Sequence, residues 1–121
     1  MLEFNLSQFE AAEELIDALH QVRDVALSGQ IPLVFWDEFD TSLAGHQLGW
    51  LRYFLAPMQD GAFREGQIIH PIGRAIFVFA GGTSERMEAF GQGLEGEEFR
   101  AAKVPDFVSR LKGFVNVLGP N

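Results

Sequence analysis

The sequence predicts an α/β fold, a three-layer sandwich in which a mostly parallel sheet lies between two layers of helices. Two observations predict this fold. Short, continuous apolar runs at 33–36 and 75–80 have the composition of strands that are buried on both faces. Segments with the 3.6-residue apolar period of helices separate these runs, and such alternation of strands and helices is typical of a parallel sheet.

Length and composition describe one globular unit. The 121 residues correspond to a single domain, 1–121, and the apolar content of 47%, with 12 Phe, excludes a disordered chain. The chain has no Cys, which excludes a disulfide scaffold and a Cys-ligated metal site. We expect no membrane span, because no run of about 18 uncharged apolar residues is present. The acidic N-terminal stretch predicts no secretory signal, and hence a cytoplasmic location.

The first expected elements are a strand and a helix. Phe4 and Leu6 alternate with polar residues, which indicates a short strand. Ser7 and Glu10 have the spacing of a capping box and predict that a helix begins there. Residues 28–29, Ser-Gly, end it. The residues on its apolar face are Leu15, Leu19, Val22 and Ala26.

A second helix is expected after the strand at 33–36. Thr41 or Ser42 would cap it, and Pro57 and Asp60-Gly61 would stop it. Its apolar face would contain Leu48, Leu51, Leu55 and Met58. The remaining expected elements are a hairpin at 62–69 with Arg64 at its tip, the strand at 75–80, a helix at about 84–90, a charged loop at 91–103, a helix from Pro105 to about 111, and a strand at 114–117.

Two carboxylates, Asp37 and Glu38, directly follow the first buried strand. Parallel sheets bind ligands at the carboxyl ends of their strands. Asp at such a position suits Mg²⁺ held through water, and Glu can polarise a water for attack. The alternative is that residues 37–40 cap the next helix and are solvated.

Two further polar positions follow in the sequence. Thr83 or Ser84 comes after the second apolar strand, where a hydroxyl can contact a phosphate or cap a helix. Arg110 ends a short helix, where its guanidinium can pair with phosphate oxygens or form a surface salt bridge.

These three signals, in this order, resemble the second half of the nucleotide-binding domain of AAA+ ATPases, the P-loop NTPase superfamily. The resemblance covers nearly the whole chain and implies a Walker B motif at 33–38, with Asp37 positioning Mg²⁺ and Glu38 activating water. It further implies Thr83 as the sensor of the ATP γ-phosphate and Arg110 as an arginine finger acting on a neighbouring subunit. Family members form rings, usually hexamers, that hydrolyse ATP to remodel a macromolecular partner.

The sequence departs from the family in one major respect. A P-loop requires Gly-x-x-x-x-Gly-Lys-[Ser/Thr], but Lys103 and Lys112 are the only lysines and neither follows a Gly. We therefore expect this chain to be an inactive fragment of a longer ATPase, whose P-loop unit lies upstream and whose helical lid lies downstream. Two other functions stay open: a non-catalytic interaction module, and an Mg²⁺-dependent phosphoesterase that uses Asp37, Glu38 and Asp40.

Several patterns are interpreted as having no special chemistry. The net charge of −8 gives no nucleic-acid signal, and the partner protein is not predicted. Residues 91–96 match G-x-G-x-x-G, but no strand precedes them and Glu97-Glu98 follow, which disfavours a dinucleotide site. His20, His46 and His70 lie far apart in the sequence, without the spacing of a zinc site, and are expected to be ordinary surface or partly buried histidines.

Overall fold

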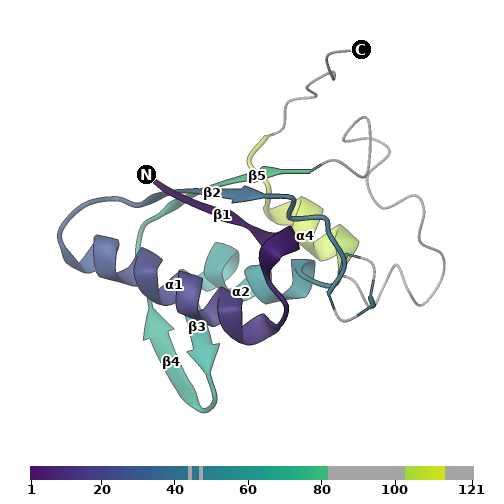
Figure 1. Ribbon diagram of the computed structural model, residues 1–121. Coiled ribbons are helices and arrows are strands. Elements are labelled where there is room, and N and C mark those ends of the chain that lie inside the picture. The colour runs from purple at the N-terminus through teal and green to yellow at the C-terminus, as the bar shows by residue number, and fades with distance from the viewer. Residues whose placement is uncertain (44, 47, 82–102, 114–121) are drawn as a thin grey trace.

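A computed structural model describes residues 1–43, 45–46, 48–81 and 103–113 (Figure 1). Their centre is a three-stranded parallel sheet formed by β1 (Leu2–Asn5), β2 (Leu33–Asp37) and β5 (Ile76–Ala80). The strand order is β1-β2-β5, so that β2 is the central strand. The predicted α/β class and the parallel sheet are confirmed.

One face of the sheet carries the aromatic core. Trp36, fully buried on β2, stacks on Phe4 of β1 with 5.1 Å between ring centroids. It also meets Phe77 of β5 edge-on at 5.4 Å, and Phe54 of the helix layer at 5.0 Å. These contacts join all three strands to the helices, because alternate side chains of a strand point to the same face.

Helix α1 (Ala12–Leu27) packs Leu15, Ala18, Leu19 and Val22 into this core. It begins later than the capping box at Ser7 and Glu10 predicts. Asn5 accepts hydrogen bonds from Ser7, and residues Leu6–Gln8 form the short 3₁₀-helix η1. Glu14, rather than Glu10, bonds back to the backbone at the start of α1, where it accepts from the N–H of Ala11 at 3.1 Å. The predicted helix is confirmed, and its predicted cap is wrong.

Helix α2 (Leu51–Asp60) is shorter than expected. The prediction that Thr41 or Ser42 caps it is wrong, since the preceding segment turns back on itself and Leu48 has a left-handed φ of 55°. Pro57 lies inside the helix and is buried, so it does not stop it. Gly61, with a φ of 64°, ends it as predicted, because glycine adopts the left-handed cap conformation without strain.

The predicted hairpin is present as β3 (Ala62–Glu65) and β4 (Ile68–Pro71), joined by Gly66 and Gln67. The tip is therefore at Glu65–Gln67 rather than at Arg64. Figure 1 shows the hairpin projecting from the helix layer, on the side away from the parallel sheet.

The last described helix is α4 (Val104–Arg110), close to its predicted bounds. Phe107 is fully buried and packs on Phe79 of β5 and on Phe39, at ring-centroid distances of 5.1 Å and 5.4 Å. The predicted helix at 84–90, the predicted loop at 91–103 except for Lys103, the strand at 114–117 and the candidate residues Thr83 and Ser84 lie outside the described residues.

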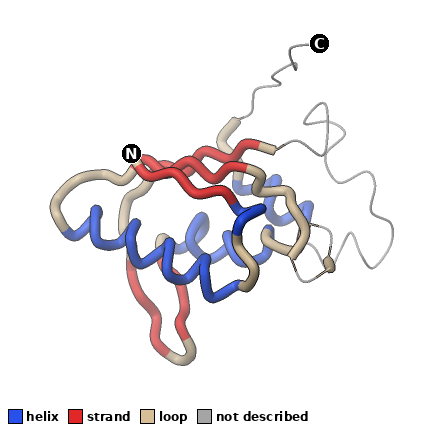
Figure 2. Tube along the Cα trace, viewed as in Figure 1, coloured by secondary structure: helices blue, strands red, loops and turns tan. Residues whose placement is uncertain are grey.

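Within the described part of the chain, all helices lie on one face of the sheet, which gives two layers rather than the predicted three (Figure 2). The opposite face exposes large apolar side chains of β2 and β5. Leu33 is 40% exposed, Ile76 56% and Val78 40%. No described helix is both long and apolar enough to cross a membrane.

Candidate functional site

The carboxyl ends of the three parallel strands form the candidate site predicted from the sequence. Asp37, the last residue of β2, is paired in register with Asn5 of β1 and Ala80 of β5. Its side chain is half-buried, and its Oδ1 accepts a hydrogen bond of 2.9 Å from the N–H of Glu38. The first predicted carboxylate therefore lies at the centre of this edge.

Glu38 has an unusual backbone and an exposed side chain. Its φ of 50° is in the left-handed region, which costs a residue with a Cβ about 1–2 kcal/mol. The turn that follows is fixed at both ends: Phe39 donates its N–H to Ala80 at 3.2 Å, and Thr41 donates to the carbonyl of Glu38 at 3.1 Å. The second carboxylate is therefore exposed to solvent at the start of this turn.

Asp40 is oriented differently from the other two acidic residues. It is only 6% exposed, and its carboxylate lies against the backbone of Gly81 at the end of β5. Asp37, Glu38 and Asp40 do not converge, since the one group of three metal-ligating side chains in the described segments lies elsewhere. This arrangement does not provide the three-carboxylate centre that the phosphoesterase alternative needs.

Arg110 lies at the exposed end of α4. Its guanidinium donates a hydrogen bond of 2.8 Å to Oε1 of Gln59, near the end of α2, and a longer one of 3.5 Å to Ser109. Arg110 therefore bonds to a neutral amide here, and not to a carboxylate as in the surface salt bridge that the sequence left as an alternative. Because Phe107 on the same helix stacks on Phe39, α4 is held against the turn that follows Glu38.

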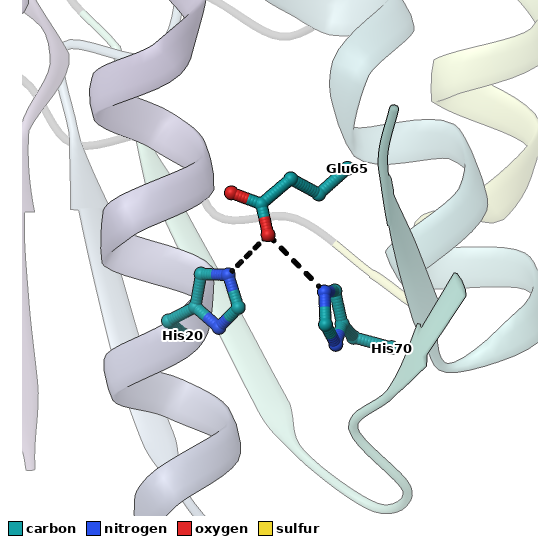
Figure 3. Close-up of side chains that lie close together, drawn as sticks. All are labelled: His20, Glu65 and His70. Carbon is teal, nitrogen blue, oxygen red and sulfur yellow. Dashed lines mark hydrogen bonds and ion pairs between the residues drawn. The ribbon is translucent and has the colours of Figure 1, made fainter. Parts of the chain in front are cut away.

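A second cluster, not predicted from the sequence, joins His20 of α1 to the hairpin (Figure 3). The Nε2 atoms of His20 and His70 lie 3.1 Å and 3.2 Å from the same oxygen, Oε1 of Glu65. Hydrogen bonds from both imidazoles lower the pKa of Glu65, with the His20 bond contributing most. We call these three residues the His–Glu–His cluster.

His20 and His70 are partly buried, as expected, but the structure brings them together around Glu65, which the sequence analysis did not predict. His46 lies outside the cluster and is exposed. Part of the cluster had a signal in the sequence. The hairpin has a two-residue loop, so that Glu65 pairs with Ile68 and Phe63 pairs with His70. Glu65 and His70 are therefore diagonal neighbours on the same face of the hairpin. The third member, His20, is 45 residues from Glu65, and no local pattern predicts that contact.

Comparisons with protein families, with curated proteins and with solved structures found no match to this chain.

Proposed function

We propose that this chain is part of the nucleotide-binding core of an AAA+ ATPase, and that the carboxyl edge of β2 is its Mg²⁺-ATP site in the intact protein. One observation carries the proposal. The central strand of a parallel sheet buries Val34 and Trp36 and then presents Asp37 and Glu38, at the edge where parallel sheets bind ligands.

The strand order supports the same proposal. The resemblance places the P-loop strand beside the strand that precedes the sensor residue, which here is β5. In the described part of the chain, β5 pairs with β2 on one side and with no strand on the other. The sheet face on which Leu33, Ile76 and Val78 are exposed carries no helix among the described residues, and the proposal would place helices of the intact core there.

The residues at this edge have distinct roles in the proposal. Asp37, half-buried and held by the N–H of Glu38, would hold Mg²⁺ through water. Glu38 is exposed and would polarise the attacking water. Thr83 would contact the γ-phosphate, and Arg110 would act on the ATP of the next subunit in a ring, usually a hexamer in this family. Remodelling of a macromolecular partner would be driven by hydrolysis.

The coding region upstream of Met1 provides the first test. A Gly-x-x-x-x-Gly-Lys-[Ser/Thr] loop within about 20–40 residues, the length of one strand–loop–helix unit, is expected. ATP hydrolysis by the protein that carries that loop should be lost in the Asp37→Asn and Glu38→Gln variants. Full hydrolysis by both variants would reject the proposed site.

One observation favours the alternative of a non-catalytic interaction module. The sheet face that exposes Ile76 and Val78 is apolar. Exposed apolar faces of this kind bind partner proteins, and they also occur where part of a core is missing. The same upstream region distinguishes the two, because an interaction module needs no Gly-Lys loop. A protein that begins at Met1, and binds a partner through this face without nucleotide, would support the module.

A further inference from the structure

We propose that the His–Glu–His cluster is a binding site for a divalent transition-metal ion, with Zn²⁺ as the best match. The cluster is separate from the carboxyl edge of β2, and the inference does not depend on the proposed ATPase function. Its ligand atoms come from three elements: His20 from α1, Glu65 from the end of β3, and His70 from β4 (Figure 3).

The spacing of the ligand atoms fits a small ion. Nε2 of His20 and Nε2 of His70 lie 3.1 Å and 3.2 Å from Oε1 of Glu65, and the three ligand atoms all lie within 4.8 Å of one another. Tetrahedral zinc with bonds of about 2.0–2.1 Å separates its ligand atoms by roughly 3.3–3.5 Å. Small side-chain movements would therefore bring the three atoms to the spacing that the ion requires.

The two imidazole rings are positioned by packing. The buried ring of Phe63 contacts His20 edge-on and lies beside His70, with 5.0 Å between centroids in both cases. The two histidine rings are themselves 4.7 Å apart. Phe63 is the direct cross-strand partner of His70, so the hairpin register fixes the position of that ligand. Metal sites depend on this kind of support for their ligands.

The donor set selects the class of ion. Two imidazole nitrogens and one carboxylate oxygen suit zinc and other late first-row metals, whereas Mg²⁺ and Ca²⁺ prefer oxygen ligands. Three protein ligands leave a fourth position for water. The side chains are accessible, with 34% of His20, 52% of Glu65 and 18% of His70 exposed. Glu65 also lines a groove of about 530 Å³ between α1, α2 and the hairpin, so one of the three ligands borders open space.

Bound zinc would fasten the hairpin to α1. Without the ion, the same side chains are linked through two hydrogen bonds that share one carboxylate oxygen. Coordination would replace these two bonds with three metal–ligand bonds. The structural consequence is a hairpin whose position on α1 depends on the metal.

Isothermal titration calorimetry of the full 121-residue chain with ZnCl₂ tests the proposal. The protein should carry no histidine tag and should be treated with EDTA and dialysed. We expect one Zn²⁺ per chain and a melting temperature that rises with zinc. Glu65→Gln and His70→Gln should each weaken zinc binding by at least about 10-fold. That is the smallest loss typical when a residue that only supports a ligand is replaced, and these residues are the ligands themselves.

His46→Gln is the matched control, because it removes the one histidine outside the cluster. This variant and Asp37→Asn should bind zinc as the wild type does, and excess Mg²⁺ should not compete. Absence of zinc binding by the wild type would overturn the proposal. An equal loss of affinity in His46→Gln would also overturn it, by placing the ion elsewhere.

Circular dichroism shows whether the variants fold. If Glu65→Gln or His70→Gln unfolds, the visible spectrum of the wild-type chain with Co²⁺ decides the question without any substitution. The intense bands of four-coordinate Co²⁺, removed by added Zn²⁺, would support the site. The weak spectrum of hydrated Co²⁺ would reject it.

Discussion

The carboxylate of Asp40 lies in the space that a side chain at Gly81 would occupy. A Cβ atom added to Gly81 would come within 2.6 Å of Oδ2 of Asp40 and 2.8 Å of the Phe39 ring. The turn after β2 is thus packed directly on the end of β5. This contact adds to the parallel pairing of β2 with β5, which already places Asp37 opposite Ala80 at one edge of the sheet.

We predict that Gly81→Ala destabilises the fold. The added methyl group cannot fit beside Asp40 without movement of the turn that carries Glu38, and overpacking of this kind costs about 1–3 kcal/mol. Urea denaturation measures the free energy of unfolding. Gly113→Ala is the control, because no atom of the described residues lies within 4 Å of its added Cβ. Equal stability of the two variants would show that the turn adapts freely.

The isolated chain should hydrolyse no ATP and bind it weakly. The carboxylates at 37 and 38 can serve the metal ion, but the backbone amides and Lys of a P-loop supply most phosphate contacts in this class of enzyme, and the sequence has no Gly-Lys pair. Calorimetric titration with Mg-ATP measures the affinity. Micromolar binding would contradict this prediction and would require another phosphate-binding segment.

In the intact ATPase, Arg110→Ala should leave ATP binding nearly unchanged and reduce hydrolysis by roughly 10³–10⁵-fold, the contribution typical of an arginine finger. Gln59→Ala is the control. It removes the hydrogen-bond partner of Arg110 within this chain and should leave hydrolysis intact. Steady-state ATPase rates and nucleotide titrations distinguish the two effects. A similar loss in Gln59→Ala would show that Arg110 only supports the packing of α4.

Mixed rings test the same residue between subunits. Glu38→Gln should also bind ATP without turnover. Because the two substitutions affect opposite sides of a subunit interface, mixing them should create some interfaces in which Arg110 and Glu38 are both present. ATPase activity should then exceed that of either variant alone. No recovery in rings with proven co-assembly would reject action in trans.

The outer edge of β5 predicts self-association of this chain. Within the described segments no strand pairs with this edge, which adjoins the apolar side chains of Ile76 and Val78. Unpaired strand edges tend to pair with other chains. Light scattering should detect dimers or larger species that Val78→Lys reduces. Leu27→Lys, at a side chain 68% exposed at the end of α1, should have no effect. A wild-type chain that stays monomeric at high concentration would contradict the prediction.

Much of the fold could be predicted because its signals are local. The apolar runs of β2 and β5 required no tertiary information, and neither did the presence of the hairpin, although its tip lies beyond the predicted Arg64. The position of Asp37 at a strand end followed from the same reading. The start of α2 could not be predicted, since the turns between Glu38 and Trp50 depend on left-handed backbone at non-glycine residues and on packing against β5.

The same distinction between local signals and tertiary contacts applies to the candidate sites. Asp37 and Glu38 are adjacent, so their position at the edge of the sheet was evident from the sequence. The His–Glu–His cluster depends on the docking of the hairpin onto α1, which places His20 beside Glu65 across 45 residues. Two residues of the cluster shared a predictable hairpin face, but the third requires the tertiary structure.

The contact between His20 and Glu65 has a consequence for how the chain is held together. It closes a loop of 45 residues that contains β2, α2 and the acidic turn between them, in a chain without a single cysteine. A covalent bridge across a loop of this length would restrict the unfolded chain and stabilise the fold by roughly 4 kcal/mol in the chain-entropy model. Coordination at these residues would act as a reversible cross-link of the same span, formed and broken by metal supply rather than by oxidation.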